Sequence, residues 1–222
     1  LYTADPSAHV FNGKIYIYPS HDEDIDVENN DNGDQYDMKD YHVYEMPDTE
    51  TYPRDCGCVL KLEDIPWASK QLWAPDCVEK DGKYYFVFPA RDKEGFFRIG
   101  IATSDKPEGP FKAEPNYIPG SYSIDPCMFP DTDGKYYLTF GGIWGGQLDQ
   151  YRNNKWSADN KEPKGDEEAC TAKIALMKDN LLEMAEEPKD IVIVDENGKP
   201  LTGGDEARRY FEDPWMFKKG DT

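Results

Sequence analysis

The sequence predicts an all-β protein built as a β-propeller, and three observations carry this prediction. The first is a series of short aromatic and β-branched blocks, bounded by Gly, Pro, Asp and Asn, which are typical of strands. The second is that helical periodicity is nearly absent, with residues 180–187 alone able to form about two helical turns. The third is an internal repeat of long period. The strand blocks cover residues 14–18, 41–46, 84–88, 97–102, 136–140, 172–177 and 191–194.

The repeat consists of an X-Pro anchor, then a Gly-Lys pair and an aromatic strand. The anchors are Asp5-Pro6, Ala74-Pro75 and Asp125-Pro126, and a fourth copy begins at Glu212-Asp213-Pro214. Each copy predicts a hairpin, and two further strands follow it before the next copy. Four antiparallel strands per repeat favour propeller blades over a sandwich, because a sandwich shows no such long-period repetition.

The repeats divide residues 1–222 into blades of one partial propeller domain. The first blade covers about 1–70, the second about 71–121, the third about 122–208, and a fourth starts at 209–222. A propeller closes its ring to bury the faces of every blade. We therefore expect the chain to be part of a longer polypeptide that carries the rest of the fourth blade and at least one more.

The composition restricts the partners. The chain has 25 Lys and Arg against 45 Asp and Glu, a net charge of -20, which disfavours nucleic acid and anionic membranes as partners. No apolar run approaches the ~20 residues of a membrane-spanning helix, so we expect a soluble protein, and no targeting segment indicates its cellular location. The five cysteines contain no CxxC pair, and we interpret them as mostly buried thiols.

Acidic residues recur at the anchor of the repeat. Asp5, Asp125 and the Glu212-Asp213 pair stand just before the proline, where the second blade has Ala74. Equivalent positions of different blades converge on the propeller axis. Asp before Pro is also ordinary turn chemistry. Three acidic copies at one cavity instead favour a paired acid and base, which is the usual equipment for cleaving a glycosidic bond.

Five separated motifs resemble glycoside hydrolase family 43. The resemblance implies a five-bladed propeller that hydrolyses plant-cell-wall xylosides and arabinosides with inversion, as a β-xylosidase, an α-L-arabinofuranosidase or both. It further implies Asp5 as general base, Asp125 as the residue that tunes the pKa of the acid and orients it, and Glu212 as general acid. The motifs are ADPS at 4–7, LWAPD at 72–76, TSDKPEGPF at 103–111, SIDP at 123–126 and RYFEDPW at 209–215.

The fourth anchor departs from the family pattern, in which a small residue usually follows the acid. Here Asp213 follows Glu212 and has the same distance to its proline as Asp5, so Asp213 is the reserve candidate for the acid. Inversion needs room for a water molecule between acid and base. We therefore predict a carboxyl separation of roughly 6.5–9.5 Å between Asp5 and Glu212, against about 5 Å in a retaining enzyme.

Four side chains are predicted to bind substrate around these carboxyls. Trp73 resembles the pocket-wall tryptophan of the family, with a core tryptophan as the alternative. Trp144 lies in the glycine-rich stretch 141–146, where glycines let the backbone approach a ligand or only form a tight turn. Phe211 adjoins the acid, and His21 follows the first aromatic strand.

Metal binding has weak support in the sequence. Residues 22–40 contain nine acidic residues, but Val27 stands where a calcium loop requires glycine, so we interpret the segment as a solvated loop. None of His9, His21 and His42 forms a metal-binding pair by spacing. We expect no metal ligands among these residues and no required cofactor. The resemblance implies a possible calcium ion on the propeller axis.

Three other functions stay open at this point. An endo-arabinanase would use the same scaffold on linear arabinan. A non-catalytic sugar-binding propeller would use the carboxylates to hydrogen-bond sugar hydroxyls. A fructosidase-type propeller would retain configuration and use an Asp nucleophile. In each case the partner is an oligosaccharide or polysaccharide.

Overall fold

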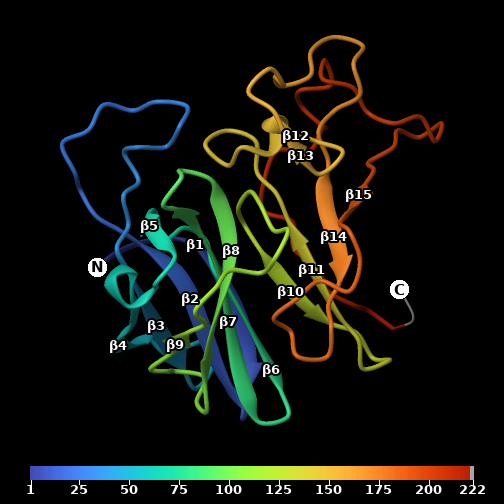
Figure 1. Ribbon diagram of the computed structural model, residues 1–222. Coiled ribbons are helices and arrows are strands. Elements are labelled where there is room, and N and C mark those ends of the chain that lie inside the picture. The colour runs from blue at the N-terminus through green and yellow to red at the C-terminus, as the bar shows by residue number, and fades with distance from the viewer. Residues whose placement is uncertain (221–222) are drawn as a thin grey trace.

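The structure, a computed structural model, describes residues 1–220 and contains three antiparallel sheets that lie side by side in chain order (Figure 1). The first sheet consists of β1 (Tyr2–Phe11), β2 (Lys14–Asp22), β3 (Asp40–Met46) and β4 (Arg54–Lys61). The second consists of β6 (Asp76–Lys80), β7 (Lys83–Asp92), β8 (Phe97–Ser104) and β9 (Lys112–Ala113), and β5 (Ala68–Lys70) also pairs with β7. The third consists of β10 (Cys127–Pro130), β11 (Tyr136–Phe140), β14 (Ala172–Leu176) and β15 (Lys189–Ile191).

Each sheet is one propeller blade, so the predicted all-β propeller is confirmed. The remaining elements are the small hairpin of β12 (Tyr151–Arg152) and β13 (Lys155–Trp156) and two short 3-10 helices, η1 (Leu62–Asp64) and η2 (Leu148–Gln150). Within residues 1–220, neither helical turn has the length or the apolar character needed to cross a bilayer.

The predicted hairpins start the three blades, as β1–β2, β6–β7 and β10–β11. The first two use a two-residue turn with positive φ at both central residues. These residues are Asn12 (φ 52°) and Gly13 (φ 77°) in the first turn, and Asp81 (φ 54°) and Gly82 (φ 78°) in the second. Such turns match the right-handed twist of the strands that they join.

The blades pack face to face through two hydrophobic cores. Between the first and second sheets, Tyr18 and Tyr41 pack against Phe86, and all three are fully buried. Between the second and third sheets, the core contains Ile99 and Phe140. These large side chains come from strand positions that the sequence marks by alternation, because one face of each strand is buried.

Asp76 joins the three innermost strands. It lies on β6, which packs against both β1 and β10. One carboxylate oxygen lies 2.6 Å from Nε2 of His9 on β1, and the other accepts a 2.8 Å hydrogen bond from the backbone N–H of Met128 on β10. The Asp76 side chain is almost wholly buried. Asp76, which directly follows the second anchor, therefore links the innermost strands of all three sheets.

Residues 180–187 do not form the helix that their pattern allowed. Leu181 adopts a left-handed φ of 58° and is fully buried, and Met184 forms a β-bridge with Met177. Burial of Leu181 in the second core therefore outweighs the weak local helix propensity.

The five cysteines are all free thiols. Cys77, Cys127 and Cys170 are buried as expected, whereas Cys58 is exposed. Residues 209–220 contain no strand, so the start of a fourth blade stays a prediction, and residues 221–222 of that segment lie outside the described residues.

Candidate functional site

The four X-Pro anchors converge at the axis of the molecule. A cavity of about 430 Å³ is lined by Asp5, Ala74, Asp125 and Asp213 together with the proline that follows each of them. Asp5 and Asp213, which are 208 positions apart in the sequence, therefore meet at one place. This convergence is the one that the repeat predicted.

The three aspartates share a strained backbone conformation. The φ angle is 45° at Asp5, 55° at Asp125 and 59° at Asp213, and Ala74 does not have a positive φ. The left-handed region costs about 1–2 kcal/mol for a non-glycine residue, and a following proline disfavours it further. Such strain concentrates at functional sites. It also makes Asp213, rather than Glu212, the backbone counterpart of Asp5.

A larger cavity of about 670 Å³ adjoins the anchors and contains most of the predicted site. Asp5, Asp125 and Glu212 line it, and so does the reserve candidate Asp213. Three of the four predicted substrate-binding residues line it as well, namely Trp73, Trp144 and Phe211. The structure thus brings carboxyl groups and aromatic surfaces from separate blades into one pocket.

Backbone and side-chain hydrogen bonds dock the segment that carries Glu212 onto the third blade. The N–H of Ile143 donates to the carbonyl of Phe211 at 3.1 Å, and the hydroxyl of Thr139 donates to the carbonyl of Pro214 at 3.1 Å. The N–H of Asp213 donates to Oδ2 of Asp125 at 3.2 Å. The position of Glu212 is therefore fixed from both sides along the chain.

Four carboxyl groups of the site, those of Asp5, Asp125, Glu212 and Asp213, have raised pKa values. Burial raises the pKa of Asp125 well above its ordinary value, and the neighbouring carboxylates of Asp213, Glu212 and Asp5 raise it further. Partial removal from water also raises the pKa of Glu212, with contributions from Asp213 and Asp5. The pKa values of Asp5 and Asp213 are raised mainly by the same partial burial. Burial and like charge both favour the neutral form of a carboxyl group, so each of these groups binds its proton more tightly than a carboxyl group in water.

The aromatic residues form two walls of the pocket. Trp73 is half-buried, packs against Phe97 at 4.7 Å between ring centroids, and donates from Nε1 to the carbonyl of Tyr36 at 2.7 Å. Trp144 is 59% exposed, and its ring lies edge-on to that of Phe211 at 4.7 Å. Trp144 and Phe211 therefore present apolar surface that a sugar ring could cover.

The glycine-rich stretch 141–146 lets the backbone approach the site closely. A Cβ atom on Gly142 would lie 2.6 Å from Cδ1 of Ile124 and 3.1 Å from Oδ2 of Asp125. Only glycine fits there without displacing one of these neighbours. The close approach is to the residues that hold the buried carboxyl.

His21 does not reach this pocket, so its predicted substrate-binding role is not supported. Its neighbour Asp22 lines the pocket instead. Successive side chains of a strand point to opposite faces, which turns His21 away when Asp22 faces the cavity. The Nδ1 atom of His21 lies 2.5 Å from Oδ1 of Asp40, and His42 is close by. β2 and β3 thus bring together His21, Asp40 and His42, which the spacing of the histidines in the sequence did not pair.

Sequence reasoning also missed one wall of the pocket. The segment interpreted as a solvated loop, residues 23–39 between β2 and β3, lines the cavity with Asn30, Tyr36 and Met38. Arg91 holds it there by donating to the carbonyl of Asn32 at 2.9 Å. The apolar residues Tyr36 and Met38 within this acidic loop were the available signals.

Comparisons with known proteins identify the family. Residues 1–190 match the profile of the Glycosyl hydrolases family 43. A "Xylosidase/arabinosidase 43A" from Humicola insolens is 58% identical over 98% of this chain and 69% of its own length.

Two solved structures are similarly close. One is of RS223-Beta-xylosidase, with a TM-score of 0.96 and 54% identity over 99% of this chain and 68% of that one. The other is a GH43 β-xylosidase/α-arabinofuranosidase from a compost microbial metagenome, in complex with xylotriose and in calcium-free form. It has a TM-score of 0.95 and 55% identity over 98% of this chain and 67% of that one.

The chain thus spans about two thirds of the length of these relatives. The family profile and the high identities agree. The chain belongs to glycosyl hydrolase family 43.

Proposed function

We propose that this chain is an inverting glycosidase that releases xylose, arabinose or both from xylan or arabinan oligosaccharides. The observation that carries the proposal is that Asp5, Asp125 and Glu212 meet in one cavity with aromatic walls. The names of the close relatives point to the same pentoside substrates. An uncharged sugar also avoids the repulsion that a chain with a net charge of -20 would impose on an anionic ligand.

In the proposed reaction, Asp5 in its ionised form removes a proton from a water molecule as the water oxygen attacks the anomeric carbon. Glu212 in its protonated form gives its proton to the leaving oxygen while the glycosidic bond breaks. The new bond forms on the face opposite the broken one, which inverts the anomeric configuration. The raised pKa of Glu212 suits the acid, and the raised pKa of Asp5 makes it a stronger base when ionised.

Asp125 is proposed as a positioning residue. It accepts the N–H of Asp213, the residue next to Glu212, and this contact holds the acid in place. Its electrostatic repulsion with Glu212 and Asp213 favours retention of a proton within the group of carboxyls. Roughly 6.5–9.5 Å between the carboxyls of Asp5 and Glu212 stays the predicted separation.

Asp5→Asn tests the base. The variant should lose about 10²–10⁴ in kcat or more on aryl β-xyloside and aryl α-L-arabinofuranoside, while ligand binding measured by calorimetry persists. Asp24→Asn removes an exposed carboxylate outside the pocket and is the matched control. Full turnover by Asp5→Asn would refute the assignment.

Glu212→Gln and Asp213→Asn separate the two candidate acids. Loss of the acid should slow substrates with poor leaving groups far more than aryl glycosides whose leaving group needs no proton. We expect this dependence for Glu212→Gln. If it follows Asp213→Asn instead, Asp213 is the acid.

The alternatives have their own readouts. Proton NMR of the first-formed anomer distinguishes inversion from the retention expected of a fructosidase-type enzyme. Preferred cleavage of linear arabinan would identify an endo-arabinanase. Sugar binding by the wild type with no turnover on any of these substrates would identify a sugar-binding propeller.

Calcium on the propeller axis is proposed as an optional ligand. The axial cavity presents the carboxylates of Asp5, Asp125 and Asp213, and calcium takes oxygen ligands of this kind. A bound ion would supply positive charge that offsets the repulsion among these carboxylates. Calorimetric titration of the wild type with calcium should show saturable binding that Asp213→Asn weakens, and absence of binding would overturn the idea.

A further inference from the structure

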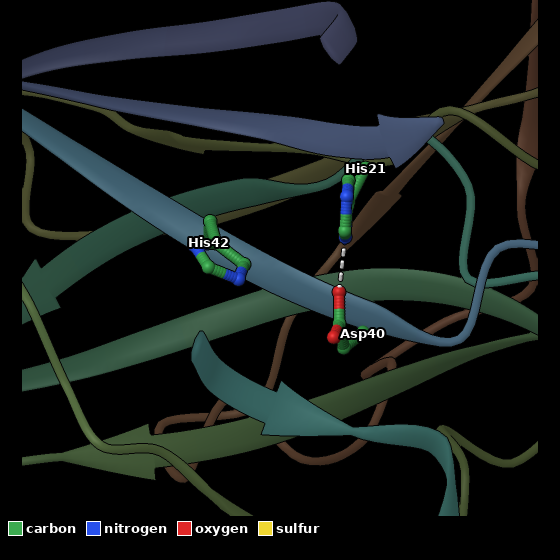
Figure 2. Close-up of side chains that lie close together, drawn as sticks. All are labelled: His21, Asp40 and His42. Carbon is green, nitrogen blue, oxygen red and sulfur yellow. Dashed lines mark hydrogen bonds and ion pairs between the residues drawn. The ribbon is translucent and has the colours of Figure 1, made fainter. Parts of the chain in front are cut away.

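Three potential metal ligands meet outside the carboxyl pocket, on two neighbouring strands. Figure 2 shows His21 at the end of β2 beside Asp40 and His42 at the start of β3. The Nδ1 atom of His21 lies 2.5 Å from Oδ1 of Asp40, and the rings of His21 and His42 lie 5.3 Å apart between centroids. One ligand atom from each of the three residues lies within 4.8 Å of the other two.

The strand geometry explains this meeting. β2 and β3 are antiparallel, and Ile17 pairs with Tyr44. Continued toward the end of β2, the same register places His21 opposite Asp40. Asp40 and His42 are two positions apart on β3, so both side chains lie on the same face of the sheet.

The donor set and its surroundings suit a transition-metal ion. Two imidazoles with one carboxylate are ligands that zinc and its neighbours take, whereas calcium prefers oxygen alone. Asp55 lies against Nδ1 of His42 at 3.0 and 3.1 Å from its two carboxylate oxygens, which leaves Nε2 of His42 for an ion. A carboxylate on the second ring nitrogen is the usual outer partner of a metal-binding histidine.

Access and distance are also compatible with an ion. The side chains of His21, Asp40 and His42 are 13%, 24% and 15% exposed, so they reach solvent but are mostly shielded from it. Tetrahedral zinc with bonds of about 2.0–2.1 Å needs ligand atoms about 3.3 Å apart. To reach this spacing, ligand atoms that are now up to 4.8 Å apart would move about 1.5 Å closer together, and Nδ1 of His21 and Oδ1 of Asp40, now 2.5 Å apart, would separate by about 0.8 Å.

We propose that His21, Asp40 and His42 form a binding site for a divalent transition-metal ion of the zinc class. The site stands at the base of the loop 23–39, because its ligands come from the last residues before that loop and the first residues after it. A bound ion ties the end of β2 to the start of β3. The same loop lines the carboxyl pocket, so the ion also steadies one wall of that pocket.

Zinc titration of chelator-treated chain by isothermal calorimetry tests the site directly. We expect one zinc ion per chain, and at least tenfold weaker binding in His21→Ala and in His42→Ala. Asp24→Asn, in the exposed part of the same loop, should bind zinc as the wild type does. Zinc should also slow proteolytic cleavage within residues 23–39 of the wild type but not of His42→Ala.

A second measurement on the wild type does not depend on whether the variants fold. Cobalt(II) should produce visible absorption bands of a nitrogen-ligated ion, and added zinc should abolish them. Absence of saturable zinc binding, equal weakening in Asp24→Asn, or full binding in both histidine variants would overturn the site. These outcomes concern metal binding and are independent of glycosidase turnover.

Discussion

The substitution Asp125→Asn replaces the buried carboxyl group by an amide. We expect the variant to have a higher unfolding free energy than the wild type, by a difference that grows as the pH rises. Asp125 is only 7% exposed, and burial together with Asp213, Glu212 and Asp5 raises its pKa well above the ordinary value. Asparagine keeps an oxygen that can accept the N–H of Asp213, now at 3.2 Å. The substitution therefore removes a charge and retains the hydrogen-bond acceptor.

The magnitude follows from proton linkage. A carboxyl whose folded pKa is raised contributes stability that is fully present below its unfolded pKa, about 3.9, and is lost as pH rises through the folded pKa. Between these two pKa values, the wild type loses about 1.4 kcal/mol of unfolding free energy per pH unit relative to Asp125→Asn. The variant should thus gain stability over the wild type while losing its catalytic activity.

Urea denaturation of both proteins at about pH 5 and about pH 6 measures the difference in unfolding free energy between Asp125→Asn and the wild type. Asp205→Asn is the control with the opposite electrostatics, because hydrogen bonds from Thr202 and Arg208 lower the pKa of Asp205 to about 2. The stability that the ionised Asp205 contributes is present above its unfolded pKa and is lost only as the pH falls toward 2. The difference in unfolding free energy between Asp205→Asn and the wild type should therefore not change between pH 5 and pH 6. A difference for Asp125→Asn that is constant, or that shrinks with pH, would refute the reasoning.

Two further predictions concern stability. Asp76→Ala should lower the unfolding free energy by about 3–5 kcal/mol, because it leaves His9 and the N–H of Met128 without their buried partner. A loss below about 1 kcal/mol in urea denaturation would contradict this. Gly33→Ala should cost about 1–3 kcal/mol more than Gly82→Ala in the same assay, because both sites have positive φ but only at Gly33 would the new Cβ lie 2.4 Å from the Trp73 ring. Equal losses of unfolding free energy for the two variants would show that the Trp73 ring moves aside without cost.

Much of the fold and of the pocket was predictable because short motifs in the sequence mark each copy of the repeat. The anchors and the Gly-Lys turns mark the start of each blade, and the axis of a propeller converts equal positions in the repeat into neighbours. Asp5 and Asp125 could therefore be placed together before any coordinates. The glycines of 141–146 predicted a backbone that approaches a ligand or turns tightly, and the structure shows Gly142 close to Ile124 and Asp125.

Other features depend on contacts between distant parts of the chain, which local patterns do not encode. Residues 180–187 have some helical periodicity, yet Leu181 is drawn into the core between two blades. The acidic residues of the loop 23–39 indicate a solvated loop, yet hydrogen bonds from Arg91 and Gln71 hold the loop at the pocket. His21 lies outside the pocket that Asp22 lines, because alternation along the strand, not proximity in sequence, decides which face a side chain occupies.

By itself the sequence determined the β architecture, the order of the blades and the acidic character of the axis, since each of these repeats along the chain. Tertiary structure alone decided which carboxyl is buried, how the backbone presents Glu212 and Asp213, and that two histidines and an aspartate meet at the base of a loop. The physical reason is that burial, strain and ligand distances are set by the packing of one blade or strand against another, and no single segment contains both sides of such a contact.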